Sequence, residues 1–243
     1  MAIEREKTYK EASLTPDSAL KVRLREGARR VLRLFGWRSE RDVEYDFAYR
    51  NVVGSGLKIL DIGGCDSLLP LFLAKAGHHV TVYDFRKYPE RHPNLTVIQG
   101  DFLSNDLPAG SFDLVILIST IEHIGLGGYG APEYSNADFT VMKEVNRILI
   151  DKGKVVVTFP FNEKEIIIPK FERWYTPERV RQLFEGWYVV DVEYWVPEKK
   201  LLGRWVKWKP ATMQQAAEAY RKLGMHGLAC FALSKHLKEW WER

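Results

Sequence analysis

Short apolar runs alternate with longer segments of helical spacing through the middle of the chain. Apolar runs occupy residues 57–62, 79–83, 95–98 and 114–118, and a helix is predicted over 68–76, after the first run. The run 114–118 is apolar at every position, as is typical of a central strand covered on both faces. This alternation predicts an α/β domain with a mostly parallel sheet and helices on both faces.

The pattern continues towards the carboxyl end with further strands and helices. A helix is predicted over 136–150, where Val141, Val145 and Ile148 recur at helical spacing. Thr176 and Pro177 mark the start of another helix, with threonine as the cap and proline in the first turn. The other predicted elements are a turn at 151–153, strands at 154–159, 188–195 and 228–233, and an excursion at 197–226 that contains a helix over 211–223.

The amino-terminal part has a different pattern. The pattern over residues 16–35 predicts a helix with one apolar stripe and arginines over its other faces. Residues 1–52 are therefore interpreted as a helical extension of a domain at 53–243. Such a helix either packs on its own domain or lies on acidic lipid or RNA. Tyr45, Phe47 and Tyr49 either line a ligand site or belong to the core.

Composition limits the class of protein more than it identifies a function. The chain has 243 residues, 46% hydrophobic and 28% charged, which suits one α/β domain with extensions. Its net charge of +4 is too small to indicate nucleic acid by itself. The chain shows no apolar signal core and no apolar run near the roughly 18 residues of a membrane span. With only two cysteines, we expect a reduced, cytoplasmic protein.

The loop after the first predicted strand carries the first candidate chemistry. The strand ends at Asp61 and is followed by Gly63 and Gly64, which allow a sharp turn beside a ligand. A dinucleotide fingerprint has glycine at its first, third and sixth positions, but Cys65 and Leu68 stand at the last two here. S-adenosylmethionine has no pyrophosphate and carries a positive sulfonium, so an acid and small residues suit it better.

At this loop the chain resembles the class I S-adenosylmethionine-dependent methyltransferases, whose first motif reads roughly acid-x-G-x-G-x-G. Gly63 matches the first glycine, and Cys65 and Ser67 stand at the other two positions. The resemblance covers roughly residues 57–233. It implies a Rossmann-like, seven-stranded, mostly parallel sheet with an antiparallel last strand, and S-adenosyl-L-methionine as the cofactor bound by Asp61, Gly63, Gly64 and Cys65.

Acids also follow the second and third predicted strands. Asp84 lies roughly 20 residues after the first acid, where a carboxylate accepts ribose hydroxyls and repels the ribose phosphate of NADP. The resemblance implies that Asp101 accepts a hydrogen bond from the adenine amino group and that Phe102 lies against the ring. Phe85 and Ser119 complete the predicted cofactor set, with Ser119 beside the methionine portion. Alternatively, Asp84 and Asp101 only cap the turns that follow.

The segment after the fourth strand has the most unusual composition, with the run E-H-I-G-L-G-G-Y-G at 122–130. Glu-His at this place is found in many small-molecule methyltransferases, and the longer run resembles a poorly characterised branch of them. His123 is the candidate base, because an imidazole titrates near neutrality, and Glu122 orients it, holds substrate or does neither. Alternatively, Glu122 bonds loop amides and His123 packs beneath the glycine-rich segment. Tyr129 is a weaker candidate for substrate contact. Ser119 replaces the first acid of a related magnesium motif, so no metal is predicted.

These observations predict methyl transfer to an oxygen or nitrogen of a small-molecule or glycan-like substrate. One alternative is an RNA methyltransferase that binds through the basic helix with Trp205, Trp208 and Lys209. Another is a non-catalytic binding module, since the glycine motif is altered. An NAD-dependent enzyme is disfavoured by Cys65 and Leu68. The acceptor and the oligomeric state are not determined by the sequence.

Overall fold

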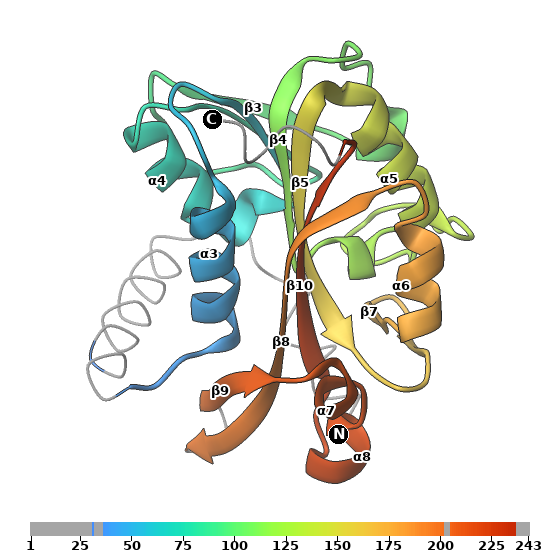
Figure 1. Cartoon of the computed structure of the whole chain (residues 1–243). Helices are drawn as coiled ribbons and strands as arrows, with labels where there is room; N and C mark the ends of the chain where they lie inside the picture. Colours follow the sequence, from blue (N-terminus) through green and yellow to red (C-terminus); the bar gives the residue numbers. More distant parts are fainter. Residues whose placement is uncertain (1–30, 32–35, 202–204, 237–243) are drawn as a thin grey trace.

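The computed structural model describes residues 31, 36–201 and 205–236 (Figure 1). The predicted basic helix over 16–35 therefore lies outside the described residues, apart from the helical Val31. The segment that leads into the domain forms a further helix, α3, at Glu40–Asn51. Ser39 caps α3 and exchanges hydrogen bonds with Asp42, which fixes where the helix begins.

One sheet organises the domain, with the strand order β3-β2-β1-β4-β5-β10-β8-β9. Neighbours from β3 to β5 are parallel, β10 is antiparallel to β5 and β8, and β9 is antiparallel to β8. This confirms the predicted Rossmann-like sheet with an antiparallel last strand, enlarged from seven strands to eight. The strands are β1 Lys58–Ile62, β2 His79–Asp84, β3 Leu95–Gln99, β4 Phe112–Ile118, β5 Leu149–Phe161, β8 Tyr188–Leu201, β9 Trp205–Ala211 and β10 Gly227–Ser234.

Helices cover both faces of this sheet, with α3 and α4 on one face and α5 and α6 on the other (Figure 1). Two apolar clusters form the core, one on each side, because the buried central strands contribute side chains to both faces. The remaining helices are α4 Leu69–Lys75, α5 Ala137–Ile148, α6 Pro177–Leu183, α7 Met213–Ala217 and α8 Ala219–Leu223, with short 3₁₀ turns η1 Gly64–Asp66, η2 Phe102–Ser104 and η3 Ile121–His123.

The predicted turn at 151–153 is instead part of β5. The pairing with β4 jumps from Phe112–Leu149 to Leu114–Lys154, so residues 150–153 form an irregularity within the strand. Turn-forming residues can be accommodated in this way when the strand on either side is paired. The prediction of a separate turn was therefore wrong, although the strand at 154–159 is confirmed.

The excursion at 197–226 also differs from the prediction. β8 extends to Leu201 and pairs with β9, and the predicted helix at 211–223 is divided into α7 and α8. A small hairpin of β6 Ile166–Ile168 and β7 Glu172–Trp174 was not predicted, because strands of three residues leave little pattern in the sequence. Both β7 and β9 contribute side chains to the site described next.

Candidate functional site

A cavity of about 780 Å³ lies at the carboxyl ends of the parallel strands, within the usual size range of ligand pockets. Open α/β sheets bind ligands at this edge, where the strand order reverses beside β1. The cavity has a strand-end half, lined by the loops after β1, β2 and β3, and an outer half, lined by η3, α3, β7, β9 and His226. The predicted residues that line it are Asp61, Gly63, Gly64, Asp84, Phe85, Asp101, Phe102, Ser119, Glu122 and His123.

Gly63 and Gly64 are both required by close contacts in the loop after β1. Gly63 has φ +77°, and a Cβ there would lie 2.4 Å from Cγ2 of Thr120. A Cβ on Gly64 would lie 2.5 Å from Oδ1 of Asp61. The two glycines therefore let the loop fold over the first acid, as the sequence predicted, without a pyrophosphate-binding glycine pattern.

Cys65 is the one predicted cofactor residue that does not line the cavity. Its side chain is buried against Val82 and Tyr88, and burial raises the pKa of its thiol. Its backbone N–H donates to Oδ2 of Asp84 at 3.0 Å. Cys65 was predicted to bind the cofactor, and the structure instead packs its side chain beside β2, at the 3₁₀ turn η1. Cys65 acts through its backbone, which holds the second strand-end acid.

Asp84 and Asp101 both line the cavity and both accept hydrogen bonds from the turns that follow them. Oδ1 of Asp84 accepts from the backbone N–H of Arg86 at 2.8 Å, and the Nε atom of Arg86 lies 3.4 Å from the same oxygen. Oδ1 of Asp101 accepts from the N–H of Leu103 at 2.9 Å. The two predicted roles, turn capping and lining a ligand site, are thus compatible in one arrangement.

The carboxyl group of Asp61 is buried at the bottom of the strand-end half. Burial raises its pKa to about 8, repulsion from Asp84 adds to the rise, and Arg41 opposes it. A buried carboxyl group with a raised pKa gains from a nearby positive charge, which favours its ionised form. The strand-end half is therefore electrostatically suited to a ligand with a cationic group.

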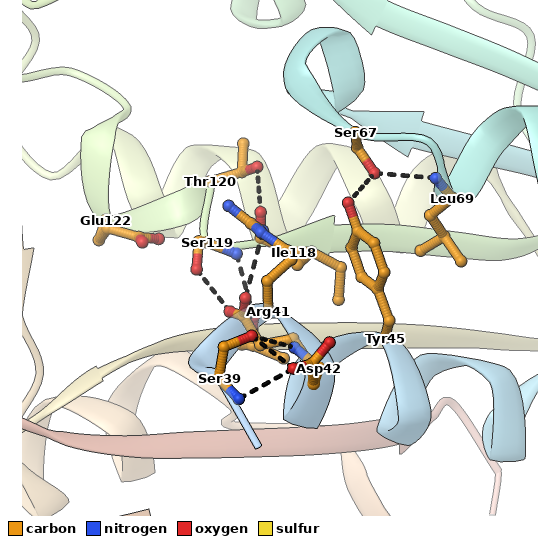
Figure 2. Close-up of polar contacts among 12 residues, drawn as sticks. Ser39, Arg41, Asp42, Tyr45, Ser67, Leu69, Ile118, Ser119, Thr120 and Glu122 are labelled. Carbon is orange, nitrogen blue, oxygen red and sulfur yellow. Dashed lines mark hydrogen bonds and ion pairs between the residues drawn. The ribbon is translucent and has the colours of Figure 1, made fainter. Parts of the chain in front are cut away.

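Helix α3 closes the cavity with residues that the sequence analysis missed. The hydroxyl groups of Ser119 and Thr158 donate to the buried Glu44, the latter at 2.6 Å, and Nη1 of Arg41 lies 3.2 Å from the other oxygen of Glu44. Figure 2 shows Arg41 extending from α3 towards the end of β4. No short motif identifies these residues, because their partners lie 75 and 114 positions away in the sequence.

The three aromatic residues left open by the sequence have separate places on α3. Tyr45 is hydrogen-bonded through its hydroxyl group to the hydroxyl of Ser67, with 2.8 Å between the oxygens, which joins α3 to the loop after β1 (Figure 2). Phe47 is fully buried in the core, and Tyr49 is exposed. Helical geometry distributes the three side chains over different faces, so they do not form one lining.

His123 and Glu122 lie together at the start of the outer half. Nδ1 of His123 is hydrogen-bonded to the carbonyl oxygen of Phe171, which can only accept, so Nδ1 carries the proton and Nε2 keeps its lone pair. Nε2 lies 3.7 Å from a carboxyl oxygen of Glu122. Burial lowers the pKa of His123 and raises that of Glu122 well above its usual range. Burial thus disfavours the charged form of each side chain when no ligand is present, and a cationic partner would favour the ionised form of Glu122.

Residues far apart in the sequence complete the outer half. Tyr129, which was predicted as a weaker substrate contact, lines it and lies edge-on to His123 with 5.4 Å between ring centroids. Trp208 lines it as well, buried beside His226, with 5.7 Å between ring centroids. The sequence analysis missed Glu40, Phe171, Glu172 and His226 in this wall, since they follow no recognisable spacing.

Metal-binding clusters and membrane-spanning helices are both absent from the part of the chain that the structure describes. Within it, no group of three or more histidine, cysteine, aspartate or glutamate side chains is arranged to hold a metal ion. None of its helices combines the length and the apolar character needed to cross a membrane.

Comparisons with known proteins agree with this geometry. Residues 60–157 match a family model described as a methyltransferase domain, which spans β1 to β5 and all three strand-end acids. No curated protein matches the chain. Several hundred solved chains share the fold. One is the 1,6-didemethyltoxoflavin-N1-methyltransferase of Burkholderia thailandensis, solved with 1,6-didemethyltoxoflavin and S-adenosylhomocysteine, at a TM-score of 0.59 and 13% identity over 94% of this chain and 98% of that one.

Two other similar structures differ in their chemistry. A putative sarcosine dimethylglycine methyltransferase from Galdieria sulphuraria aligns at a TM-score of 0.53 and 15% identity, covering 81% of this chain and 84% of that one. The [4+2]-cyclase SpnF aligns at 0.55 and 16% identity, covering 82% of each. At these identities the likeness establishes the fold and leaves the reaction to be argued from the site.

Proposed function

We propose that this protein, which has the fold and the methyltransferase domain of the class I S-adenosylmethionine-dependent methyltransferase superfamily, transfers a methyl group to an oxygen or nitrogen of a small molecule. The observation that carries the proposal is the convergence of Asp61, Asp84 and Asp101 on one cavity that continues to His123. S-adenosylmethionine is the cofactor that this superfamily indicates. When bound, it would supply a methyl group attached to a positively charged sulfur.

The residues of the strand-end half fit the parts of this cofactor. Asp84 would accept the ribose hydroxyls, and Asp101 with Phe102 would receive the adenine. The methionine portion would lie over Gly63, near the buried Asp61. The guanidinium group of Arg41 would pair with the carboxylate of the cofactor, because such a group forms two parallel hydrogen bonds to a carboxylate.

In the outer half, the residues of η3 would position the acceptor and receive its proton. A methyl transfer needs the acceptor aligned with the reactive carbon and water excluded, and needs a base when the acceptor carries a proton. His123 meets this need, since its hydrogen bond to the Phe171 carbonyl leaves Nε2 free to accept. The buried Glu122 beside Nε2 would stabilise the imidazolium that forms.

Calorimetry with S-adenosylhomocysteine tests the first half of this proposal. We expect one site per chain, and no heat with NAD, because the loop after β1 lacks the glycine pattern for a pyrophosphate. Absence of heat and of a thermal shift with S-adenosylhomocysteine would instead favour a methyltransferase-like module that binds partners without catalysis. A salt-sensitive affinity for RNA would favour the nucleic-acid alternative.

A variant of His123 tests the second half. With an acceptor found by screening for S-adenosylhomocysteine release, His123→Ala should slow turnover by roughly 10²–10⁴-fold, as expected for loss of a general base. The affinity for S-adenosylhomocysteine should stay within about twofold. Because burial lowers the pKa of His123, the wild-type rate should fall only as the pH drops below the usual imidazole range, and the variant should lose this fall.

His79→Ala is the matched control, since His79 is exposed at the start of β2 and does not line the cavity. It should retain the wild-type rate and pH profile. Equal turnover in His123→Ala and the wild type would remove His123 from the reaction and return it to the structural role that its hydrogen bond to Phe171 also serves.

A further inference from the structure

The outer half of the cavity carries more acidic groups than the proposed cofactor can account for. Glu40 and Glu44 come from α3, Glu122 from η3 and Glu172 from β7. In the described part of the chain two guanidinium groups line the cavity, and both already have acidic partners: Arg41 pairs with Glu44, and Arg86 pairs with Asp66 and Asp84. The whole chain has a net charge of +4, so this negative wall is a local feature.

These carboxyl groups are close enough to affect one another. Burial raises the pKa of Glu122 well above its usual range, and repulsion from Glu172, Glu44 and Glu40 adds to the rise. Burial likewise raises the pKa of Glu40 to about 7, with His226 opposing the shift and Glu44 adding to it. Four acids from three separate elements therefore face one volume.

One carboxyl oxygen of Glu122, which lines this part of the cavity, has no hydrogen-bond partner. Glu122 is 1% exposed and lines the cavity, yet its Oε2 atom has no hydrogen-bond partner. A buried carboxyl oxygen without a partner costs free energy unless a ligand supplies a donor or a positive charge. The position of Glu122 beside His123 places that missing donor next to the proposed base.

Aromatic side chains also line this wall. Trp208 and Phe171 line the outer half together with Tyr129. Carboxylates combined with aromatic faces are the arrangement that binds organic ammonium groups, because the ring faces are negative and the acids compensate the charge. A neutral polyol would supply hydroxyl donors but would leave the charge of the glutamates uncompensated.

We propose that the methyl acceptor is an organic amine that enters as a cation and is held by Glu40, Glu122 and Glu172 against the faces of Trp208 and Phe171. This inference rests on the proposed function and narrows its acceptor from oxygen or nitrogen to nitrogen. The bound ammonium gives one proton to Nε2 of His123. The nitrogen lone pair then forms the new N–C bond, and the C–S bond breaks with its electron pair left on sulfur.

The first experiment compares two probes of one shape on the full chain saturated with S-adenosylhomocysteine. 2-Phenylethylamine is a cation at pH 7.5, and 2-phenylethanol is its neutral counterpart. We expect calorimetry to show at least tenfold tighter binding of the amine. Equal affinities for the two probes, or tighter binding of the alcohol, would overturn the assignment of a cationic acceptor.

Variants that remove single negative charges then show which glutamates cause the preference for the amine. Glu172→Gln keeps an oxygen for the indole N–H of Trp174, which now donates to Glu172 at 2.8 Å, so the local structure should survive. Glu40→Gln and Glu172→Gln should each weaken amine binding about fivefold and leave the alcohol unchanged. Glu178→Gln, at an exposed position on α6 outside the cavity, should change neither. Unchanged amine binding in both cavity variants would contradict the proposal.

The pH dependence of amine binding is a further test, because a purely structural role of Glu40 would not change it. Glu40 faces Arg41 and Glu44 on its own helix, Glu172 on β7, and His226 before β10. Its carboxyl group is ionised above a pKa of about 7, so amine affinity should rise between pH 6 and 8. Glu40→Gln should flatten the rise, and a rise that persists in full would count against Glu40.

Failure of this inference is distinguishable from failure of the proposed function. If S-adenosylhomocysteine does not bind, the proposed function fails, and the assignment of an amine as methyl acceptor, which rests on it, is overturned as well. If S-adenosylhomocysteine binds and 2-phenylethylamine shows no preference, the cofactor site stands and only the amine acceptor is rejected.

Discussion

The two halves of the cavity are built in different ways. The strand-end half comes from consecutive loops after β1, β2 and β3, and its acids stand within about 40 residues of one another in the sequence. The outer half brings together α3, η3, β7, β9 and His226, which span nearly the whole described chain. The position of the strand-end half thus follows from the course of the parallel strands, whereas the outer half depends on contacts among side chains from separate elements.

This difference explains why one half is general and the other is specific. Loops at the carboxyl ends of parallel strands always meet at one edge, so any chain with this sheet can present acids there. The outer half depends on the β8–β9 pairing that brings Trp208 in and on the short hairpin that brings Glu172 in. We therefore expect substitutions in the first half to affect cofactor binding and those in the second to affect acceptor binding, except at Arg41 of α3, which we propose to pair with the cofactor.

The largest effect on stability is expected at Gly63, where a side chain would change the backbone conformation of the loop after β1. Gly63→Ala adds a Cβ at 2.4 Å from Thr120 and forces an L side chain into φ +77°. The combination should lower the free energy of unfolding by roughly 2–4 kcal/mol. Gly110→Ala is the control, because Gly110 has φ +62° but nothing within 4 Å of its added Cβ. Denaturant unfolding of both variants separates backbone strain from the contact with Thr120, and equal losses would show that the contact is harmless.

A somewhat smaller effect is expected at the link between the two halves. Glu44→Ala removes the acceptor for the hydroxyls of Ser119 and Thr158 and leaves Arg41 without its ion pair. Loss of these buried partners should lower the free energy of unfolding by about 2–3 kcal/mol. Glu178→Ala, on the exposed side of α6, should stay within about 0.5 kcal/mol of the wild type.

A double-mutant cycle sharpens this prediction. Ser119→Ala combined with Glu44→Ala should cost less than the sum of the single changes, because both remove one hydrogen bond. Strict additivity would show that α3 is not held to the end of β4 through this contact.

The smallest effect is expected from removing a single side chain of the proposed cofactor site. Asp84→Ala should weaken S-adenosylhomocysteine binding by roughly tenfold or more, because the ribose hydroxyls lose their acceptor. Asp106→Ala, at an exposed acid outside the cavity, is the control for charge alone. An unchanged dissociation constant in Asp84→Ala would place the ribose elsewhere. The thermal stability of Asp84→Ala should be measured in parallel, since Asp84 also accepts from Cys65 and Arg86.

Sequence patterns predicted the sheet, most helices and the strand-end acids with useful accuracy. The reason is that burial periodicity and strand-end motifs are local, so one stretch of sequence contains the whole signal. Cys65 illustrates the limit of this reasoning. Its position in the motif indicated a cofactor contact, but the direction of its side chain depends on the turn η1 and on the space beside Val82 and Tyr88.

The amino-acid sequence by itself determined an α/β domain with three acids at successive strand ends and an imidazole after the fourth strand. Only the tertiary structure decided that Glu44 holds Ser119 and that Glu40 and Glu172 share a wall with Trp208. These contacts join segments that hydrophobic burial brings together from distant parts of the chain. No local pattern encodes them, because each residue has its role only through its partner.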